Sequence, residues 1–146
     1  MIALKENKIT VSEYLRIREQ VGWRPLLQDQ AAQALDHSLY VVGAYDGEWL
    51  VGMGRIVGDG AVICYVQDLI VVPEYQKQKI GSMVLETLMA YVEHIRKNGS
   101  QMMLCLMCAK GRESFYEKHG FIARPTQELG PGMIQYLRDE KMERQE

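Results

Sequence analysis

Apolar and polar positions follow two different periods along the chain, and the change of period predicts the order of the elements. Near the N-terminus, residues 2–10 have the pattern of a strand. Two short stretches with helical spacing follow, at residues 12–20 and 28–35. Gly22 and Pro25 interrupt the pattern between them, so a loop is expected to join the two helices.

From residue 39 the pattern becomes that of three consecutive strands. The strands expected here cover residues 39–45, 49–57 and 61–72. Asp46-Gly47 is a strong signal for a tight hairpin turn, and residues 58–60 contain two further glycines. Consecutive strands joined by tight turns form an antiparallel meander.

A long helix is predicted next, at residues 79–97. Apolar residues from Ile80 to Ile95 share one of its faces, and Asn98-Gly99 supplies a C-terminal stop. Residues 102–107 are continuously apolar, as in a central strand that is covered on both faces. A strand, a helix and a strand in this order form a crossover, so this strand should run parallel to the last meander strand.

The C-terminal part has weaker signals. A short helix is expected at residues 111–119, a turn at 130–132 and a last strand at 133–137. We expect residues 1–140 to form a single domain and residues 141–146 to form a frayed tail.

Composition excludes several classes of protein. Hydrophobic residues make up 47% of the chain, charged residues 25%, and the net charge is −2, without the basic excess that nucleic-acid binding needs. The longest apolar run, residues 102–109, is too short to span a bilayer. Lys5, Glu6 and Lys8 stand where a secretion signal would need apolar residues. We therefore expect a cytoplasmic protein with neither a nucleic-acid nor a membrane partner.

The three cysteines, Cys64, Cys105 and Cys108, do not form a disulfide framework. Cys105 and Cys108 have the C-x-x-C spacing of a redox pair or of half a zinc site, but no second pair of ligands has zinc spacing. The preferred interpretation is that both are small core residues of the apolar run, with partial exposure left open for Cys108 near its end. No metal is expected.

The segment from Gln67 to Ser82 carries the most chemical information. It reads as a strand, a turn and a helix whose first turn contains Gly81. The unpaired N–H groups and positive dipole end of such a helix bind phosphate, and Lys77 and Lys79 add positive charge. Neither a P-loop nor a dinucleotide glycine motif is present, so these residues alone leave the segment open between an anion site and an ordinary strand-to-helix turn.

Two motifs connect this segment to a known family. Residues 71–82, Val-x-Pro-x-Tyr-Gln-x-x-x-Ile-Gly-Ser, resemble the acetyl-CoA signature of the GNAT N-acyltransferase superfamily, usually written Gln/Arg-x-x-Gly-x-Gly/Ala. Gln76 and Gly81 match its ends, while Lys79 stands where a glycine is usual. Residues 115–121 resemble the family's Phe-Tyr-x-x-x-Gly-Phe segment at the family spacing. With the matching order of elements, the resemblance covers nearly the whole chain.

The resemblance implies an α/β fold with a mixed, mainly antiparallel sheet and helices on both faces. A central parallel strand pair would splay to form the acetyl-CoA cleft. The pantetheine arm would pair with the signature strand, the pyrophosphate would meet the N–H groups of the loop, and an N–H near Val71 would polarise the thioester. The implied cofactor-binding residues are Leu69, Ile70, Val71, Gln76, Lys77, Gln78, Lys79, Ile80, Gly81, Ser82 and Tyr116.

The implied reaction is transfer of an acetyl group from acetyl-CoA, as co-substrate, to a primary amine by direct attack in a ternary complex. Tyr116 falls where the family commonly places the acid that protonates the thiolate; it could instead be a core aromatic. Asp68 is the candidate base, or else a strand-end carboxylate paired with a cation. Tyr65 and Gln67 could line the same cleft. Ala109 replaces an asparagine that touches the cofactor in many members.

The superfamily builds its acceptor site from the first two helices and their loop. Here that implies Trp23 and Arg24 as substrate-binding residues, although Trp23 could equally anchor the loop to the sheet. The acceptor, expected to be a small molecule, stays open between polyamine, aminoglycoside, amino acid and protein N-terminus. The three histidines, His37, His94 and His119, are expected to be structural.

Two functions other than acetyl transfer are compatible with these residues. A catalytically weak sensor that binds acyl-CoA is suggested by Lys79 and Ala109, and a redox or metal protein by Cys105 and Cys108. An open sheet edge would also allow a homodimer.

Overall fold

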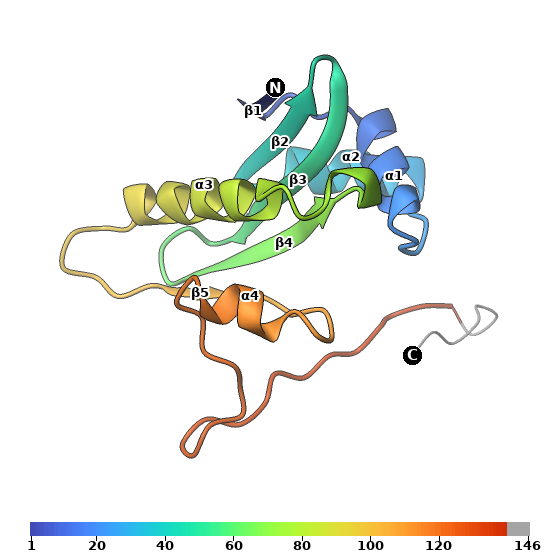
Figure 1. Cartoon of the computed structure of the whole chain (residues 1–146). Helices are drawn as coiled ribbons and strands as arrows, with labels where there is room; N and C mark the ends of the chain where they lie inside the picture. The colour runs from blue at the N-terminus through green and yellow to red at the C-terminus, as the bar shows by residue number, and fades with distance from the viewer. Residues whose placement is uncertain (140–146) are drawn as a thin grey trace. The chain divides into compact units, whose positions relative to one another are not determined.

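The computed structural model describes residues 1–139, and the chain divides into two compact units, Met1–Met107 and Cys108–Glu146 (Figure 1). The predicted tail, residues 141–146, lies outside the described residues. None of the helices within residues 1–139 combines the length and the apolar content needed to cross a bilayer.

The first unit is built on one five-stranded mixed sheet. Its strands, in their order across the sheet, are β1 (Ile2–Glu6), β2 (Tyr40–Asp46), β3 (Trp49–Gly58), β4 (Ile63–Val71) and β5 (Met103–Cys105). The first three pairings are antiparallel, and β4 with β5 is parallel. The predicted meander and the predicted parallel pair are both confirmed.

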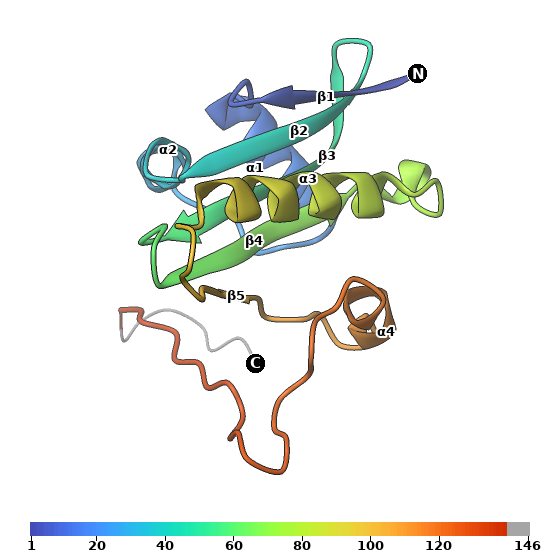
Figure 2. The same ribbon diagram turned by 90° about the vertical axis from the view of Figure 1, so that its left-hand side faces the viewer.

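Helices cover both faces of this sheet, as expected (Figure 2). They are α1 (Val11–Gln20), α2 (Gln28–Asp36) and α3 (Ile80–Ile95), with a short 3₁₀ turn, η1 (Pro73–Tyr75), before α3. Figure 2 shows α3 on one face and α1 and α2 on the other. Thr10 and Glu13 form a capping box that starts α1, with Oγ1 of Thr10 accepting from the Glu13 N–H and Oε1 of Glu13 accepting from the Thr10 N–H.

Two glycines in β3 let α3 lie close to the sheet. A Cβ atom on Gly54 would fall 2.7 Å from Cδ1 of Leu88, and one on Gly52 would fall 3.0 Å from Cγ2 of Ile80. The buried face of α3 consists of Ile80, Val84, Leu85, Leu88 and Val92. Side chains alternate along a strand. Met53, between the two glycines, and Arg55, directly after them, therefore point to the face that α1 and α2 cover.

Some boundaries differ from those expected. The third meander strand starts at Ile63 rather than at residue 61, because Oδ1 of Asp59 accepts the N–H groups of Ala61, Val62 and Ile63 and holds them in a turn. These hydrogen bonds also lower the pKa of the Asp59 carboxyl. β5 covers only Met103–Cys105, so the second half of the apolar run is outside the sheet. Among the described strands β5 is at the end of the sheet and Met103 is 50% exposed, so the expectation of a central strand covered on both faces is wrong.

In its described part, residues 108–139, the second unit contains one short helix, α4 (Glu113–Glu117), within the predicted range of 111–119. The predicted strand at residues 133–137 does not form: these residues have no regular structure, and Met133 and Leu137 are 87% and 88% exposed. A strand needs a neighbour for its backbone hydrogen bonds, and no strand forms among the described residues of this unit. The apolar residues at 133–137 do not by themselves reveal whether such a neighbour exists.

Candidate active site

The parallel strands β4 and β5 separate after three residue pairs. The last pair joins Tyr65 to Cys105, and the rest of β4, through Val71, is paired with β3 only. The sheet is therefore open at Leu69, Ile70 and Val71, as the resemblance implied. A backbone edge without a neighbouring strand can accept an extended ligand as a further strand.

A β-bulge interrupts β4 at the start of this open segment. Arg55 lies opposite Gln67, while Met53 lies opposite Ile70, so β4 has one more residue than β3 across this interval. Asp68 adopts the left-handed conformation, with φ of 54°, which is uncommon for a residue other than glycine. The bulge lets Gln67 and Asp68, two consecutive residues, both face α1 and α2.

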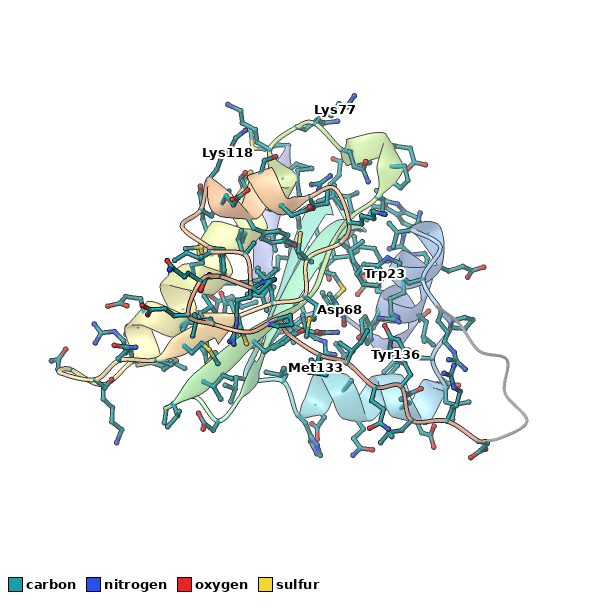
Figure 3. The ribbon with its side chains drawn as sticks, turned by 90° about the horizontal axis from the view of Figure 1, so that it is seen from below. Trp23, Asp68, Lys77, Lys118, Met133 and Tyr136 are labelled. Atoms are coloured by element: carbon teal, nitrogen blue, oxygen red, sulfur yellow. The ribbon has the colours of Figure 1, made fainter. Side chains whose placement is uncertain are left out.

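Asp68 is the buried ion-pair centre of this face (Figure 3), with a side chain only 1% exposed. Its Oδ1 accepts from Nη1 of Arg18 at 3.0 Å, and its Oδ2 accepts from Nε of Arg55 at 2.8 Å. The hydroxyl of Tyr14 donates to the same Oδ2. Burial and then Asp68 raise the pKa of Tyr14 to about 12. This is the paired carboxylate that the sequence left open as the alternative to a catalytic base.

Three residues of this cluster, Tyr14, Arg18 and Arg55, were missed by the sequence reasoning. Signals for them exist: Tyr14 and Arg18 are four apart and share a face of α1, and Arg55 interrupts the apolar strand β3. A cation at a strand position that faces a helix layer needs a carboxylate partner. Searching for that partner would have led from Arg55 to Asp68.

The loop that carries Trp23 and Arg24 is attached to the same cluster. Nη2 of Arg18 donates to the carbonyl oxygen of Arg24 at 3.1 Å, and the Arg18 guanidinium lies 5.3 Å from the centroid of the Trp23 ring. Trp23 is 39% exposed, so the ring both covers Arg18 and borders solvent. Both predicted substrate residues thus lie beside the Asp68 cluster.

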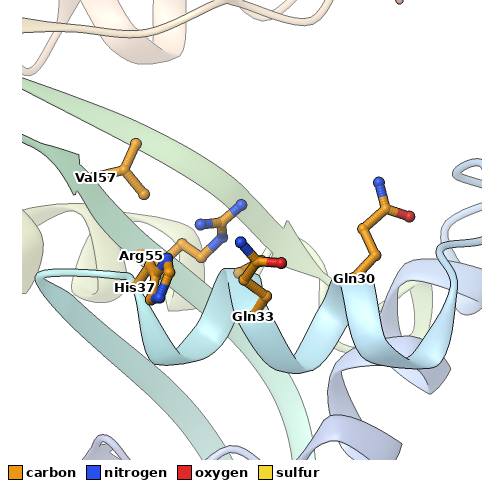
Figure 4. Close-up of a pocket in the computed structure, with 6 residues that line it drawn as sticks. Gln30, Gln33, His37, Arg55 and Val57 are labelled. Atoms are coloured by element: carbon orange, nitrogen blue, oxygen red, sulfur yellow. The ribbon is translucent and has the colours of Figure 1, made fainter. Parts of the chain in front are cut away.

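An open pocket of about 440 Å³ lies on this face, between α2 and β3 (Figure 4). It is lined by Gln30, Gln33, Ala34, His37, Arg55 and Val57. Figure 4 shows that Gln30 and Gln33 project from α2, and Arg55 and Val57 from the sheet. His37, expected to be structural, is therefore at the rim of a pocket.

The predicted phosphate loop forms the N-terminus of α3. Lys77 and Lys79 have φ of 66° and 65°, and Lys79 is the N-cap residue, without a side-chain hydrogen bond to the helix. The first N–H groups of a helix have no partner inside it. Left-handed residues at alternate positions turn successive N–H groups toward one anion, as in a nest. Lys79 therefore occupies the glycine position of the signature in a conformation that glycine adopts more easily.

Gln76 fixes this loop to the open edge of β4. Its Nε2 donates to the carbonyl oxygen of Val71 at 3.0 Å. Tyr75, one residue earlier, donates its hydroxyl to Oδ2 of Asp46 in the β2–β3 turn. Gln76 thus connects the predicted phosphate loop to the segment of β4 that is predicted to contact the pantetheine arm.

Tyr116 lies on α4 of the second unit and is half-buried. Its ring makes edge-on contacts with Phe115 and Phe121, at centroid distances of 5.1 and 5.9 Å. Burial, followed by the nearby Cys108, raises the pKa of the Tyr116 phenol. The family's Phe-Tyr-x-x-x-Gly-Phe segment is therefore a small aromatic cluster whose tyrosine stays protonated at neutral pH.

The cysteines lie in different surroundings. Cys64 is buried, Cys105 is half-buried and Cys108 is exposed, so of the two possibilities left for Cys108 the core position is wrong and the exposed one holds. The core position fails because the strand ends at Cys105. Among residues 1–139, no three histidine, cysteine or acidic side chains come together in a way that could hold a metal ion.

Comparisons with known proteins agree on one family. A family model described as an acetyltransferase (GNAT) domain matches residues 36–123. A probable acetyltransferase of unknown function from methicillin-resistant Staphylococcus aureus is 30% identical, with a TM-score of 0.82 over 93% of this chain and 100% of that one. A GNAT-family acetyltransferase from Streptococcus pneumoniae is 32% identical, with a TM-score of 0.79 over 95% and 100% of the two chains.

A more distant structure shares only the fold. The ribosomal-protein-S18-alanine N-acetyltransferase of Escherichia coli is 19% identical, with a TM-score of 0.68 over 86% of this chain and 80% of that one. No curated protein matches the chain by sequence. The family model, the two bacterial relatives, the splayed sheet and the uncapped start of α3 lead to one conclusion: this chain belongs to the GNAT acetyltransferase family.

Proposed function

We propose that this protein is an acetyl-CoA-dependent N-acetyltransferase that acts on a primary amine. The observation that carries the proposal is the open edge of β4 beside the uncapped N-terminus of α3. An open strand edge can pair with an extended amide chain, and a helix N-terminus can bind a phosphate. Coenzyme A contains an amide chain and phosphate groups.

In this proposal, the amides of the pantetheine arm pair with the backbone of Leu69, Ile70 and Val71. The pyrophosphate meets the backbone N–H groups from Lys77 to Ser82, with the ammonium group of Lys79 beside it. The exposed Lys77 adds positive charge at the same loop (Figure 3). An N–H near Val71 polarises the thioester carbonyl.

The neutral amine forms a bond to the thioester carbonyl carbon, and the C–S bond of the tetrahedral intermediate then breaks. Tyr116, the position at which the family segment commonly carries the acid, donates its phenolic proton to the departing thiolate; burial raises its pKa, so the phenol is protonated before transfer. The amine loses its proton to water. Asp68 acts by positioning Arg18 and Arg55, since both of its oxygens are engaged.

The test is the variant Tyr116→Phe, with Tyr136→Phe as its control. Tyr136 is in the same unit and is 62% exposed, so its hydroxyl is expected to have no role. We expect turnover to fall by about 10²-fold or more in Tyr116→Phe, the typical contribution of a general acid, with unchanged acetyl-CoA affinity. Unchanged turnover would remove Tyr116 from the mechanism. Binding of acetyl-CoA without turnover on any amine would favour the sensor.

A further inference from the structure

The pocket between α2 and β3 is lined only by neutral and cationic residues. Its polar side chains are two amides, an imidazole and the guanidinium of Arg55, and none of its six lining residues is acidic. Asp68, which contacts Arg55, already accepts from a second arginine and from Tyr14. Asp36, near the rim, is 85% exposed and lies 3.9 Å from Nε2 of His37.

These charges do not suit a polycation. A polyamine or aminoglycoside is recognised by carboxylates, and the buried carboxylate beside the pocket is already outnumbered by two guanidinium groups. The cluster of Arg18, Arg55 and Asp68 therefore has a net charge of one positive unit. That excess charge favours a ligand that brings an anionic group.

Arg55 has donors left for such a group. A guanidinium carries five N–H groups, and within the described residues Arg55 uses Nε on Asp68 and Nη1 on Ser38, at 2.8 and 3.2 Å. Its side chain is 12% exposed and borders the pocket. The planar fork of a guanidinium matches the two oxygens of a carboxylate.

The pocket is also placed to serve the reaction. Arg55 lies opposite Gln67, immediately before the bulge at Asp68 and the open segment of β4. A ligand anchored at Arg55 therefore lies beside β4, the strand whose open edge holds the thioester in the proposed function.

We propose that the acceptor is a small primary amine that also carries a carboxylate, as a free amino acid does. The carboxylate binds Arg55 and the polar side chains of Gln33 and His37, and the amine points to the bulge of β4. The reaction in this inference rests on the proposed function, whereas the binding of the carboxylate to the pocket does not.

The experiment compares free amino acids with their amides and with spermidine. Calorimetry without acetyl-CoA measures binding to the pocket, and release of the coenzyme A thiol measures turnover. We expect free amino acids to exceed their amides by about tenfold in both affinity and kcat/KM, the usual worth of one charge-assisted hydrogen bond. Spermidine should not be turned over faster than the amino acids.

Two variants on α2 assign the effect to the pocket. Gln33→Glu places a negative charge in the lining and should abolish the preference for the free acid over its amide. Gln28→Glu makes the same chemical change on the same helix outside the lining residues, and should leave that preference intact. Arg55→Lys, which keeps the charge but loses the planar fork, should weaken binding of the acid, if its fold is first confirmed by circular dichroism.

Failure of this inference differs from failure of the proposed function. Equal or better binding of amides or spermidine, or equal effects of Gln33→Glu and Gln28→Glu, would overturn the inference, even if amines are acetylated. Absence of acetyl-CoA binding would overturn the proposed function, while a preference for free acids in calorimetry would still support the pocket.

Discussion

Arg55 and Asp68 lie on adjacent strands on either side of a β-bulge, with Nε of the arginine 2.8 Å from Oδ2 of the aspartate. The carboxylate is buried, and a second arginine and a tyrosine complete its hydrogen bonding. Removing the charge of Asp68 would leave two partly buried guanidinium groups without a counter-charge.

Asp68→Asn is therefore expected to lower the free energy of unfolding by roughly 3–5 kcal/mol, the usual cost of breaking a buried ion pair. Urea denaturation measures this value. Asp36→Asn is the control, because that side chain is 85% exposed and its loss should cost less than about 0.5 kcal/mol. Similar effects of the two substitutions would show that the cluster contributes little to stability.

Lys79→Gly separates backbone strain from charge in the phosphate loop. A non-glycine residue in the left-handed region costs roughly 1–2 kcal/mol, so we expect the glycine variant to be more stable by about that amount. Lys79→Gln keeps the strain and removes the charge. Both variants should bind acetyl-CoA about two- to fivefold more weakly, the range of an exposed ion pair.

Thermal denaturation and titration with acetyl-CoA measure these two effects. Unchanged or improved affinity in both variants would show that the ammonium group does not contact the phosphate. The backbone site would not be affected by that result.

Gly54→Ala tests the close approach of α3 to the sheet. The added Cβ atom would lie 2.7 Å from Cδ1 of Leu88 and 2.9 Å from Cγ1 of Val84. Overpacking of this kind costs about 1–3 kcal/mol. Gly130→Ala, where no atom lies within 4 Å of the added Cβ, should be close to neutral. A neutral Gly54→Ala would show that α3 can move outward without cost.

Alkaline pH should destabilise the first unit through Tyr14. Its pKa is raised from 10.0 to about 12 in the folded protein, mainly by burial, so folding favours the protonated phenol. This contribution is present below pH 10 and is lost as the pH rises through about 12. Tyr14→Phe should flatten the fall of stability in that window.

Denaturation of both proteins between pH 8 and about pH 12 measures the difference. Tyr40 and Tyr45 have similarly raised pKa values, so part of the alkaline loss should persist in the variant. Parallel pH profiles of the two proteins would contradict the role assigned to Tyr14.

The sequence predicted the sheet well because each of its strands is signalled locally. Asp46-Gly47 marks a hairpin, the apolar run marks the position of β5, and the long amphipathic helix α3 connects two parallel strands. The same run did not reveal that β5 lies at the end of the sheet with Met103 half exposed. The predicted strand at residues 133–137 failed because pairing depends on a neighbour that periodicity does not reveal.

The site was predicted only in part, for a similar reason. The predicted phosphate loop is contiguous, so its pattern could be read directly from residues 76–82, and its role stays a prediction. The Asp68 cluster joins α1, β3 and β4, and Tyr14 is 54 residues from Asp68. Such contacts depend on the register of the strands, and the bulge that brings Gln67 and Asp68 to one face has no signal in the pattern.

That bulge determines which residues of β4 point to each face of the sheet. Before it, odd-numbered residues such as Tyr65 and Gln67 face α1 and α2; after it, the even-numbered Ile70 does, opposite Met53. Deletion of one residue at the bulge would therefore exchange the two faces of the strand beyond it. Ile70 would turn toward α3 and Leu69 toward α1 and α2. The single extra residue at the bulge therefore determines which side chains of the open segment share a face with Asp68 and Arg55.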